Sequence, residues 1–451
     1  MTVAASASRF DEVIDRRTSN SMKWAGAQTM LAPDEAAADP LPMWVADMDF
    51  RAPQPVIDAL VAAAQDGMFG YPNGATKSYV AAVTNWQRRR FGWEVAPEWV
   101  VQTSGIITAI KTIVQAFSAP GDSVLIQPPV YAHFRDDVLL NGRFPVDAPL
   151  TRTADGYRYD EKVFEAAIRP DTKIFILSHP HNPTGNVWSE AELRSMGEIC
   201  ARHGILVVAD EIHQDLIMNP ALKHVPFASL GEAFAENSIT CTAPSKTFNL
   251  PGLQSANLFI PNPRLREEFL RQYDRNMFPL VNVMGMVAAE AAYAHGEPWL
   301  EELLAYIRAN HAHFSQAVNG LNGGLRVLPA DALYLEKCRG PLYDEFALCG
   351  MAGEPRPGMP PPIYRSRDDL MRQTPAFQAT LRRDRLDHHF DSAWRLLDNH
   401  FADANPYMPA IAAHVDRVEK MIARDDFSAL TGVPKPIMAA ELRARMQSPP
   451  N

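Results

Sequence analysis

The sequence is poor in cysteine, with only Cys200, Cys241, Cys338 and Cys349 among 451 residues. Their wide spacing forms neither a CxxC pair nor the framework of a disulfide-rich secreted domain. We therefore expect buried or free thiols in a reducing, cytoplasmic environment.

Long apolar runs are also missing. No uncharged stretch approaches the roughly 18 residues that a membrane-spanning helix needs. Residues 1–10 lack the basic start and apolar centre of a signal peptide. We expect a soluble protein of the cytoplasm that makes no use of a membrane.

Basic residues are not in excess. The chain has 43 Lys and Arg against 53 Asp and Glu, a formal net charge of −10. Nucleic-acid binding needs clustered Lys and Arg, so this balance argues against it, although a local basic pocket for a phosphate group is still allowed. The length and the 47% hydrophobic share suit two or three domains with a sizeable core.

From about residue 53 to residue 300, apolar runs of strand length alternate with amphipathic stretches of helix length. This alternation is typical of βαβ units, so it predicts an α/β fold with a mostly parallel central sheet. The expected strands are 99–103, 123–127, 173–178, 206–209, 238–242 and 257–260, and the expected helices between them include 105–117, 190–203 and 264–272.

The composition suggests three parts. Residues 1–50 form an N-terminal arm and part of a smaller domain, with a buried connector at their end, and residues 51–295 form the large domain. Residues 296–451 form the rest of the smaller domain, α+β or mainly helical, with an atypical, largely helical tail from about residue 336. Within the last two parts we expect long helical patterns at 281–310, 377–401 and 411–423, and a Pro- and Gly-rich linker at 339–362.

Polar residues follow several of these strands, where ligands bind in open α/β sheets. Lys246 follows strand 238–242, and a partly buried lysine can be a nucleophile, but taken alone this position suits a surface or ion-paired lysine better. Asp210 follows strand 206–209, as a partner for a ring nitrogen or as a helix cap.

Two turns add to this pattern. Asn182 lies at the apex of a turn fixed by Pro and Gly, and the nearby His179 and His181 invite a metal interpretation, but no third ligand is close in sequence. Gly105 opens the helix after strand 99–103, where free N–H groups can bind a phosphate or simply belong to an ordinary βα turn.

Taken together and in order, these motifs resemble the fold-type I PLP (pyridoxal phosphate) enzymes of the aminotransferase class I/II superfamily. Within it, residues 8–335 resemble the PatB/MalY branch of cystathionine β-lyases, or C–S lyases. The motifs are Asp15-Arg16-Arg17 with Asn20-Ser21 and Lys23-Trp24; Val45-Ala46-Asp47-Met48-Asp49-Phe50; Gly70-Tyr71-Pro72; Gln127-Pro128-Pro129-Val130-Tyr131; His181-Asn182-Pro183-Thr184-Gly185; Asp210-Glu211-Ile212-His213; and Ser245-Lys246-Thr247-Phe248-Asn249.

The resemblance implies a role for each residue at the cofactor ring. Lys246 would hold PLP as a Schiff base, and Asp210 would pair with the protonated ring nitrogen. Asn182 would hydrogen-bond the ring 3-oxygen, and Tyr131 would stack on the ring. His213 replaces the Tyr of typical aminotransferases, which favours β-elimination over transamination; otherwise His213 is only a packing or hydrogen-bonding residue.

For the cofactor phosphate, the resemblance implies the backbone N–H groups of Ile106 and Ile107, the hydroxyl of Ser245, and Tyr71 from a neighbouring subunit. A homodimer with shared active sites follows. The implied reaction is cleavage of cystathionine or another cysteine S-conjugate to thiol, pyruvate and ammonia, with Lys246 as general base. An aminotransferase, or a PLP-binding regulatory protein with weak turnover, are the alternatives.

The sequence departs from this family after residue 335. The expected Arg that clamps the substrate carboxylate is not recognisable, and Arg356, Arg365 and Arg367 are possible substitutes. Ala243 and Gln254 stand where many relatives have a phosphate-binding Ser and an Arg. In the tail, Asp384, Asp387, His388 and Asp391 share one helical face, which fits a solvated surface better than a metal site.

Overall fold

The computed structural model describes residues 8–26, 42, 45–320, 326–340 and 343–348. The chain divides into two compact units, Met1–Met359 and Pro360–Asn451, and all described residues belong to the first. The predicted helices 377–401 and 411–423, the three candidate arginines of the tail and its acidic face lie outside the described residues.

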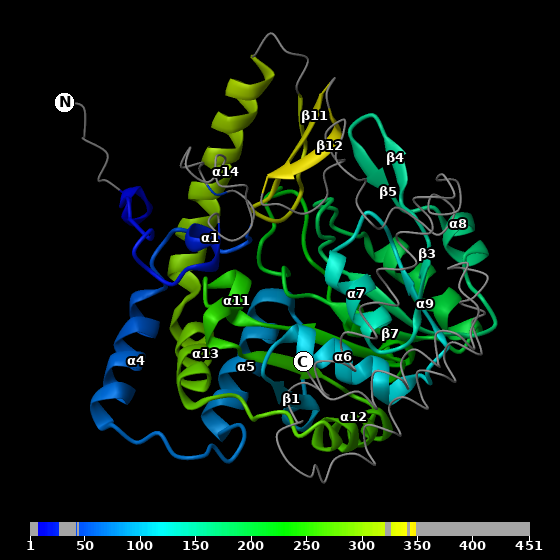
Figure 1. Ribbon diagram of the computed structural model, residues 1–451, viewed down its shortest axis with the longest axis horizontal. Helices are drawn as coiled ribbons and strands as arrows, with labels where there is room; N and C mark the ends of the chain where they lie inside the picture. Colours follow the sequence, from blue (N-terminus) through cyan, green and yellow to red (C-terminus); the bar gives the residue numbers. More distant parts are fainter. Residues whose placement is uncertain (1–7, 27–41, 43–44, 321–325, 341–342, 349–451) are drawn as a thin grey trace, which may run out of the picture. The chain divides into compact units, whose positions relative to one another are not determined.

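The first unit is built on a seven-stranded sheet (Figure 1). Only β9 runs against the others, because it pairs antiparallel with both β1 and β8. In spatial order the strands are β1 (Val100–Thr103), β9 (Ala256–Phe259), β8 (Ser238–Thr242), β7 (Leu206–Asp210), β6 (Thr172–Ser178), β2 (Ser123–Ile126) and β3 (Phe144–Asp147).

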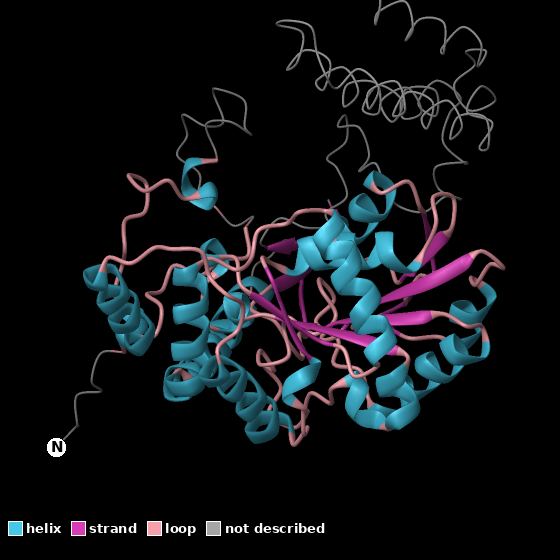
Figure 2. Cartoon of the chain, turned by 90° about the horizontal axis from the view of Figure 1, so that it is seen from below, coloured by secondary structure: helices cyan, strands magenta, loops and turns pink. Residues whose placement is uncertain are grey.

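Both faces of the sheet are buried, which is why its central strands read as apolar runs. In β6, Ile174 and Ile176 pack with one cluster of helices while Phe175 and Leu177 pack with another. Figure 2 shows helices on both sides of the strands. The first cluster includes side chains of α6 (Ile106–Phe117), α7 (Ala132–Leu140) and α12 (Pro263–Arg275), and the second includes those of α8 (Glu161–Ala166) and α9 (Glu190–Arg202).

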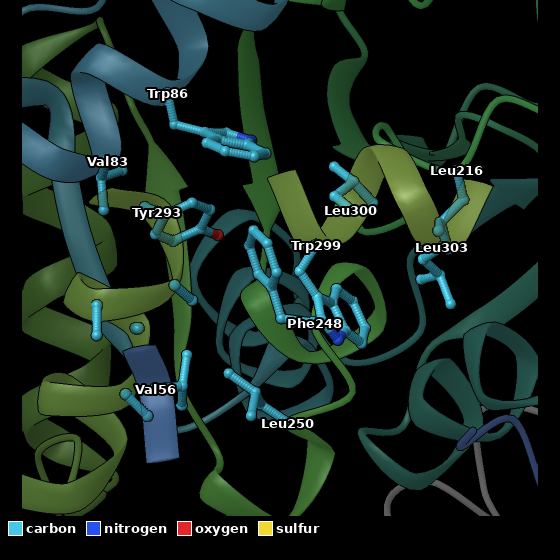
Figure 3. Close-up of a cluster of buried hydrophobic side chains, with 14 of the residues drawn as sticks. Val56, Val83, Trp86, Leu216, Phe248, Leu250, Tyr293, Trp299, Leu300 and Leu303 are labelled. Atoms are coloured by element: carbon cyan, nitrogen blue, oxygen red, sulfur yellow. The ribbon is translucent and has the colours of Figure 1, made fainter. Parts of the chain in front are cut away.

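A third core lies beside the β1–β9 end of the sheet and is rich in aromatic side chains (Figure 3). Trp86, Phe248, Tyr293 and Trp299 meet there, and all four are almost fully buried. The helices that build it are α4 (Gln54–Asp66), α5 (Lys77–Phe91), α13 (Val283–His295) and α14 (Glu297–Asn319).

The six predicted strands are all present, with ends within one residue of the expected positions. The helical pattern expected at 281–310 is two helices instead of one, because the chain breaks at Gly296 between α13 and α14. A Cβ atom at Gly296 would lie 2.5 Å from Phe248, so only glycine allows this junction to pack there.

The linker predicted at 339–362 was wrong at its start. Residues β11 (Glu336–Gly340) and β12 (Tyr343–Leu348) form antiparallel strands, and β10 (Arg326–Leu328) completes a three-stranded sheet. Backbone pairing with β11 overrides the loop signal, which came mainly from prolines beyond residue 348. A short hairpin of β4 (Thr151–Thr153) and β5 (Gly156–Arg158), flanked by polar residues, also went unpredicted.

Short elements complete the described chain. The helix that carries Lys246 is among them. They are the 3-10 turns η1 (Arg9–Asp11), η2 (Pro97–Trp99), η3 (Phe227–Leu230) and η4 (Pro251–Leu253) and the helices α1 (Met22–Ala25), α10 (Glu232–Glu236) and α11 (Pro244–Thr247). None of the helices in the described ranges combines the length and apolar character that a membrane crossing requires.

Candidate active site

The carboxyl ends of three neighbouring parallel strands bring the predicted residues together. Asp210 is the last residue of β7, and it pairs with Ser178 at the end of β6 on one side and with Cys241 of β8 on the other. Asn182 follows β6 and Lys246 follows β8. Since these ends lie at one edge of the sheet, the topology explains why residues distant in sequence share one site.

Lys246 lies on α11, a single helical turn, and its side chain is half-buried. Its Nζ donates a hydrogen bond to the Ala46 carbonyl oxygen at 2.9 Å, and the Tyr334 hydroxyl donates to the same oxygen at 2.8 Å. Neither Ala46 nor Tyr334 was assigned a role from the sequence. The backbone carbonyl therefore holds the amine beside the end of the sheet.

Asp210 is buried, with 7% of its surface exposed. Burial raises its pKa to about 7, against the opposing effects of the Ile212 N–H, 3.2 Å from Oδ1, and of the Lys246 charge. An anionic Asp210 is therefore costly unless a cationic partner approaches it. A protonated ring nitrogen is such a partner.

His213 is also buried, and it belongs to the turn that follows β7. Burial lowers its pKa to about 3, and the positive charge of Lys246 acts in the same direction. His213 is thus neutral at physiological pH and can offer a hydrogen bond but no charge. Its Nδ1 is buried and has no hydrogen-bond partner among the described residues.

Asn182 and Tyr131 come from adjacent loops that are joined through their backbones. The Tyr131 N–H donates to the Asn182 carbonyl oxygen at 3.0 Å. The side-chain Oδ1 of Asn182 is buried without a hydrogen-bond partner in the described part of the chain. Burial raises the pKa of Tyr131 to about 12, helped by the charge of Asp210, so its phenol stays neutral.

The paired histidines of the Asn182 turn make hydrogen bonds within the protein. His179 Nε2 lies 3.0 Å from the Val225 carbonyl oxygen. His181 Nε2 lies 3.2 Å from the Gln127 carbonyl oxygen, and its Nδ1 lies 2.9 Å from the Thr184 hydroxyl. These contacts explain both histidines as structural residues of the turn.

The N-terminus of α6 is the candidate phosphate site. Ile106 and Ile107 are its first residues, and no side chain caps it, so the first N–H groups have no partner within the helix. The preceding Gly105 has φ 129°, and a Cβ atom there would meet nothing within 4 Å. The backbone conformation favours glycine, and the space beside Gly105 is open.

Ser245 and Tyr71 are the other two candidate ligands of the phosphate. Ser245 lies on α11 beside Lys246 and is half-buried. Tyr71 lies in the loop between α4 and α5 with its side chain fully exposed, so the chain alone gives it no burial. The roles assigned to Ile106, Ile107, Ser245 and Tyr71 stay predictions.

A network of charges holds the segment that carries Ala46. Arg16 pairs with Asp47 and Asp49 at 2.8 Å each, and Lys23 pairs with Asp49 at 2.7 Å. The Trp24 indole N–H donates to Asp49 at 2.8 Å. The sequence motifs at 15–24 and 45–50 therefore contact each other, and their sequence pattern alone did not predict this contact.

Asn249 joins the same segment to the lysine turn. Its Nδ2 donates to the carbonyl oxygens of Met48 and Phe50, each at 2.8 Å, and its Oδ1 accepts from the Met48 N–H at 2.9 Å. Asn249 has φ 59°, a left-handed conformation that asparagine tolerates better than most residues. The choice of asparagine after Lys246 thus has a structural cause.

The comparison with known families identifies the group to which these residues belong. Residues 40–336 match aminotransferase class I and II. The chain belongs to this family. Its fold is therefore the α/β fold predicted from the sequence, and the match ends near the point where the sequence departs from the expected pattern.

The chain is also similar to individual proteins of this family. The chain is 41% identical over 329 residues to cystathionine β-lyase PatB of Bacillus subtilis, covering 72% of this chain and 83% of PatB. It is 30% identical to protein MalY of Escherichia coli, over 69% of this chain and 78% of MalY. A PLP-bound C–S lyase from Staphylococcus hominis superposes with a TM-score of 0.67 at 30% identity, covering 74% of this chain and 83% of that one.

The site fits the PLP that this family uses. A buried carboxyl group that needs a cationic partner, a lysine amine and a helix N-terminus without a side-chain cap are the groups that a pyridine nitrogen, an aldehyde and a phosphate require. The buried Oδ1 of Asn182 and Nδ1 of His213 lack partners among the described residues. These features agree with a site shaped for a polar aromatic ligand.

Proposed function

We propose that this protein is a PLP-dependent carbon–sulfur β-lyase that cleaves cystathionine or a related cysteine S-conjugate. The observation that carries the proposal is the meeting of Lys246, Asp210 and Asn182 at three adjacent strand ends, in a chain 41% identical to a cystathionine β-lyase. The overall reaction converts the conjugate and one water molecule to a thiol, pyruvate and ammonia.

Each residue of the site has a task in holding the cofactor. Lys246 would hold it covalently, Asp210 would pair with its ring nitrogen, and the first turn of α6 would bind its phosphate. When bound, PLP supplies an electron sink for the electrons of the substrate Cα–H bond. Because Asp210 is buried, it holds a proton on the ring nitrogen more firmly than a solvated carboxylate would.

Lys246 would also supply the base. With the cofactor and substrate bound, the Lys246 Nζ would accept the Cα proton, since the same short turn keeps this amine at the site. The electron pair left on the substrate would then expel the thiolate from Cβ. The Ala46 carbonyl oxygen lies within hydrogen-bond distance of this amine and orients it.

His213 favours elimination over transamination in this proposal. A neutral imidazole in this position offers no phenol to the ring 3-oxygen and no positive charge near Lys246. The alternative function is an aminotransferase, which shares the fold and the lysine. It differs in requiring a 2-oxo acid as amino-group acceptor.

A homodimer is part of the proposal. Tyr71 is fully exposed, and Met68 and Phe69 of the same loop expose 74% and 62% of their surfaces. A second copy of the chain would cover these apolar side chains and bring the Tyr71 hydroxyl to the phosphate of its neighbour. The cytoplasmic location and the lack of nucleic-acid or membrane partners stay predictions from the sequence.

The test is a product assay on the full-length protein loaded with PLP. With cystathionine and no 2-oxo acid, we expect equal amounts of thiol, pyruvate and ammonia, and none from Lys246→Ala. Product that appears only after a 2-oxo acid is added would show an aminotransferase. A loaded protein that releases no product under either condition would support the regulatory alternative.

A further inference from the structure

The turn that carries Lys246 cannot hold itself in place. Helix α11 has only four residues, and isolated helices shorter than about 12 residues are marginal in water. The position of the lysine therefore depends on the contacts of the two residues that follow it, Thr247 and Phe248. Both are buried, at 1% and 0% exposure.

Thr247 is tied to a buried carboxylate. Its hydroxyl donates to Asp215 Oδ2 at 2.9 Å, and Asp215 is 3% exposed. Asp215 lies two residues after His213, in the turn that follows β7. One hydrogen bond thus joins the lysine turn to the histidine turn.

Helix α5 holds the same carboxylate from the other side. The Trp86 indole N–H lies 3.2 and 3.3 Å from the two Asp215 oxygens, and Arg90 Nε lies 3.7 Å from Oδ1. Trp86 and Arg90 are one helical turn apart, so they reach the carboxylate together. Arg90 also pairs with Glu297 and Glu301, which orient its guanidinium.

Phe248, the second residue after Lys246, also packs against helix α5. The rings of Trp86 and Phe248 make an edge-to-face contact with their centroids 5.4 Å apart (Figure 3). Behind Phe248, Gly296 allows the α13–α14 junction to pack closely. Trp86 therefore touches both the residue after Thr247 and the carboxylate that Thr247 binds.

We propose that Asp215 is a positioning residue, which acts through Thr247 to fix the Lys246 turn relative to the turn that carries His213. This inference rests on the proposed lyase function, because the consequence is a correctly placed amine at the substrate Cα. Since proton transfer depends steeply on geometry, a loosened turn lowers the rate of the chemical step more than it weakens substrate binding.

The variant that tests this is Thr247→Val, which replaces the hydroxyl by a methyl group of similar size. We expect kcat for pyruvate release to fall about tenfold while KM for cystathionine stays within about twofold. Amide hydrogen exchange of residues 245–250 should become faster with and without PLP, because the turn loses an anchor. Thr247→Ser keeps the hydroxyl and should restore both values.

The matched control is Thr112→Val. Thr112 is equally buried, but its hydroxyl donates to the Thr108 carbonyl oxygen of its own helix at 2.9 Å. This variant should lose some stability but keep the kcat of wild type and the hydrogen exchange rates of residues 245–250. If Thr247→Val does not fold, Asp215→Asn tests the same anchor, because one amide oxygen must then serve the Thr247, Trp86 and Arg90 donors that two carboxylate oxygens serve now.

Three results would overturn the inference. One is a Thr247→Val enzyme with normal kcat and normal exchange. Another is equal loss in Thr247→Val and Thr247→Ser, and the third is equal loss in the Thr112→Val control. Failure of the proposed function is separate, since a wild-type protein that releases no pyruvate would still report through hydrogen exchange whether Asp215 anchors the turn.

Discussion

Asp210→Asn replaces a buried carboxyl group by an amide and should alter how the free energy of unfolding depends on pH. In the protein without cofactor, burial raises the pKa of Asp210 from 3.8 to about 7. The folded protein thus binds more protons than the unfolded chain between these values. The stability from this group is present below pH 3.8 and is lost as pH rises toward about 7.

The magnitude follows from the size of the shift. One pKa unit corresponds to about 1.4 kcal/mol, so the full effect is on the order of 4 kcal/mol. About 2–3 kcal/mol of it falls between roughly pH 5 and pH 8. An amide in place of the carboxyl group can still accept the hydrogen bond of the Ile212 N–H, but it does not titrate.

The assay is urea unfolding of both proteins at several pH values, first without PLP. We expect the variant to gain stability relative to wild type by about 2–3 kcal/mol as pH rises from about 5 to 8. With PLP bound, wild type should be the more stable of the two proteins, because the anionic carboxyl group then has a cationic partner. Parallel pH curves of the two cofactor-free proteins would refute the assignment of Asp210 as the buried titrating group.

Three further substitutions test other parts of the site. Arg16→Met removes the cation that pairs with both Asp47 and Asp49 and leaves Lys23 on Asp49. It should lower the free energy of unfolding by about 1–3 kcal/mol and make hydrogen exchange of residues 45–50 faster; unchanged exchange would contradict the role of these ion pairs in holding the segment. Gly105→Ala places a side chain at φ 129° and should lower stability by about 1–3 kcal/mol, measured by thermal unfolding with and without PLP, whereas equal melting temperatures would refute the strain. Tyr71→Phe should leave the unfolding of the cofactor-free chain unchanged, because Tyr71 is exposed, yet weaken PLP binding in a spectroscopic titration; equal affinity would argue against the shared site.

The sheet, and the edge of it where the site lies, were predictable because a strand buried on both faces is an apolar run in the sequence. The strand Leu206–Asp210 is fully buried and therefore reads as an uninterrupted apolar run that ends in a carboxylate. The direction of β9 was not predictable, since four apolar residues carry no signal of orientation. The break at Gly296 depends on its distance from Phe248, which only the folded chain defines.

The site shows the same division. Lys246, Asp210 and Asn182 were found through their places after strands and through a family resemblance. The Ala46 carbonyl went unassigned because a backbone oxygen has no residue type to recognise. Asp215 went unassigned because a buried aspartate is informative only once Thr247 is seen beside it.

The central claim is that Lys246 is the residue that holds the cofactor, and it can be tested directly. Borohydride reduction of the PLP-loaded wild-type protein fixes the cofactor on its lysine, and peptide mass spectrometry then locates it. The account predicts a pyridoxyl group on Lys246 alone, with loss of the visible absorbance on reduction. A pyridoxyl group on any other lysine, or none on Lys246, would contradict it.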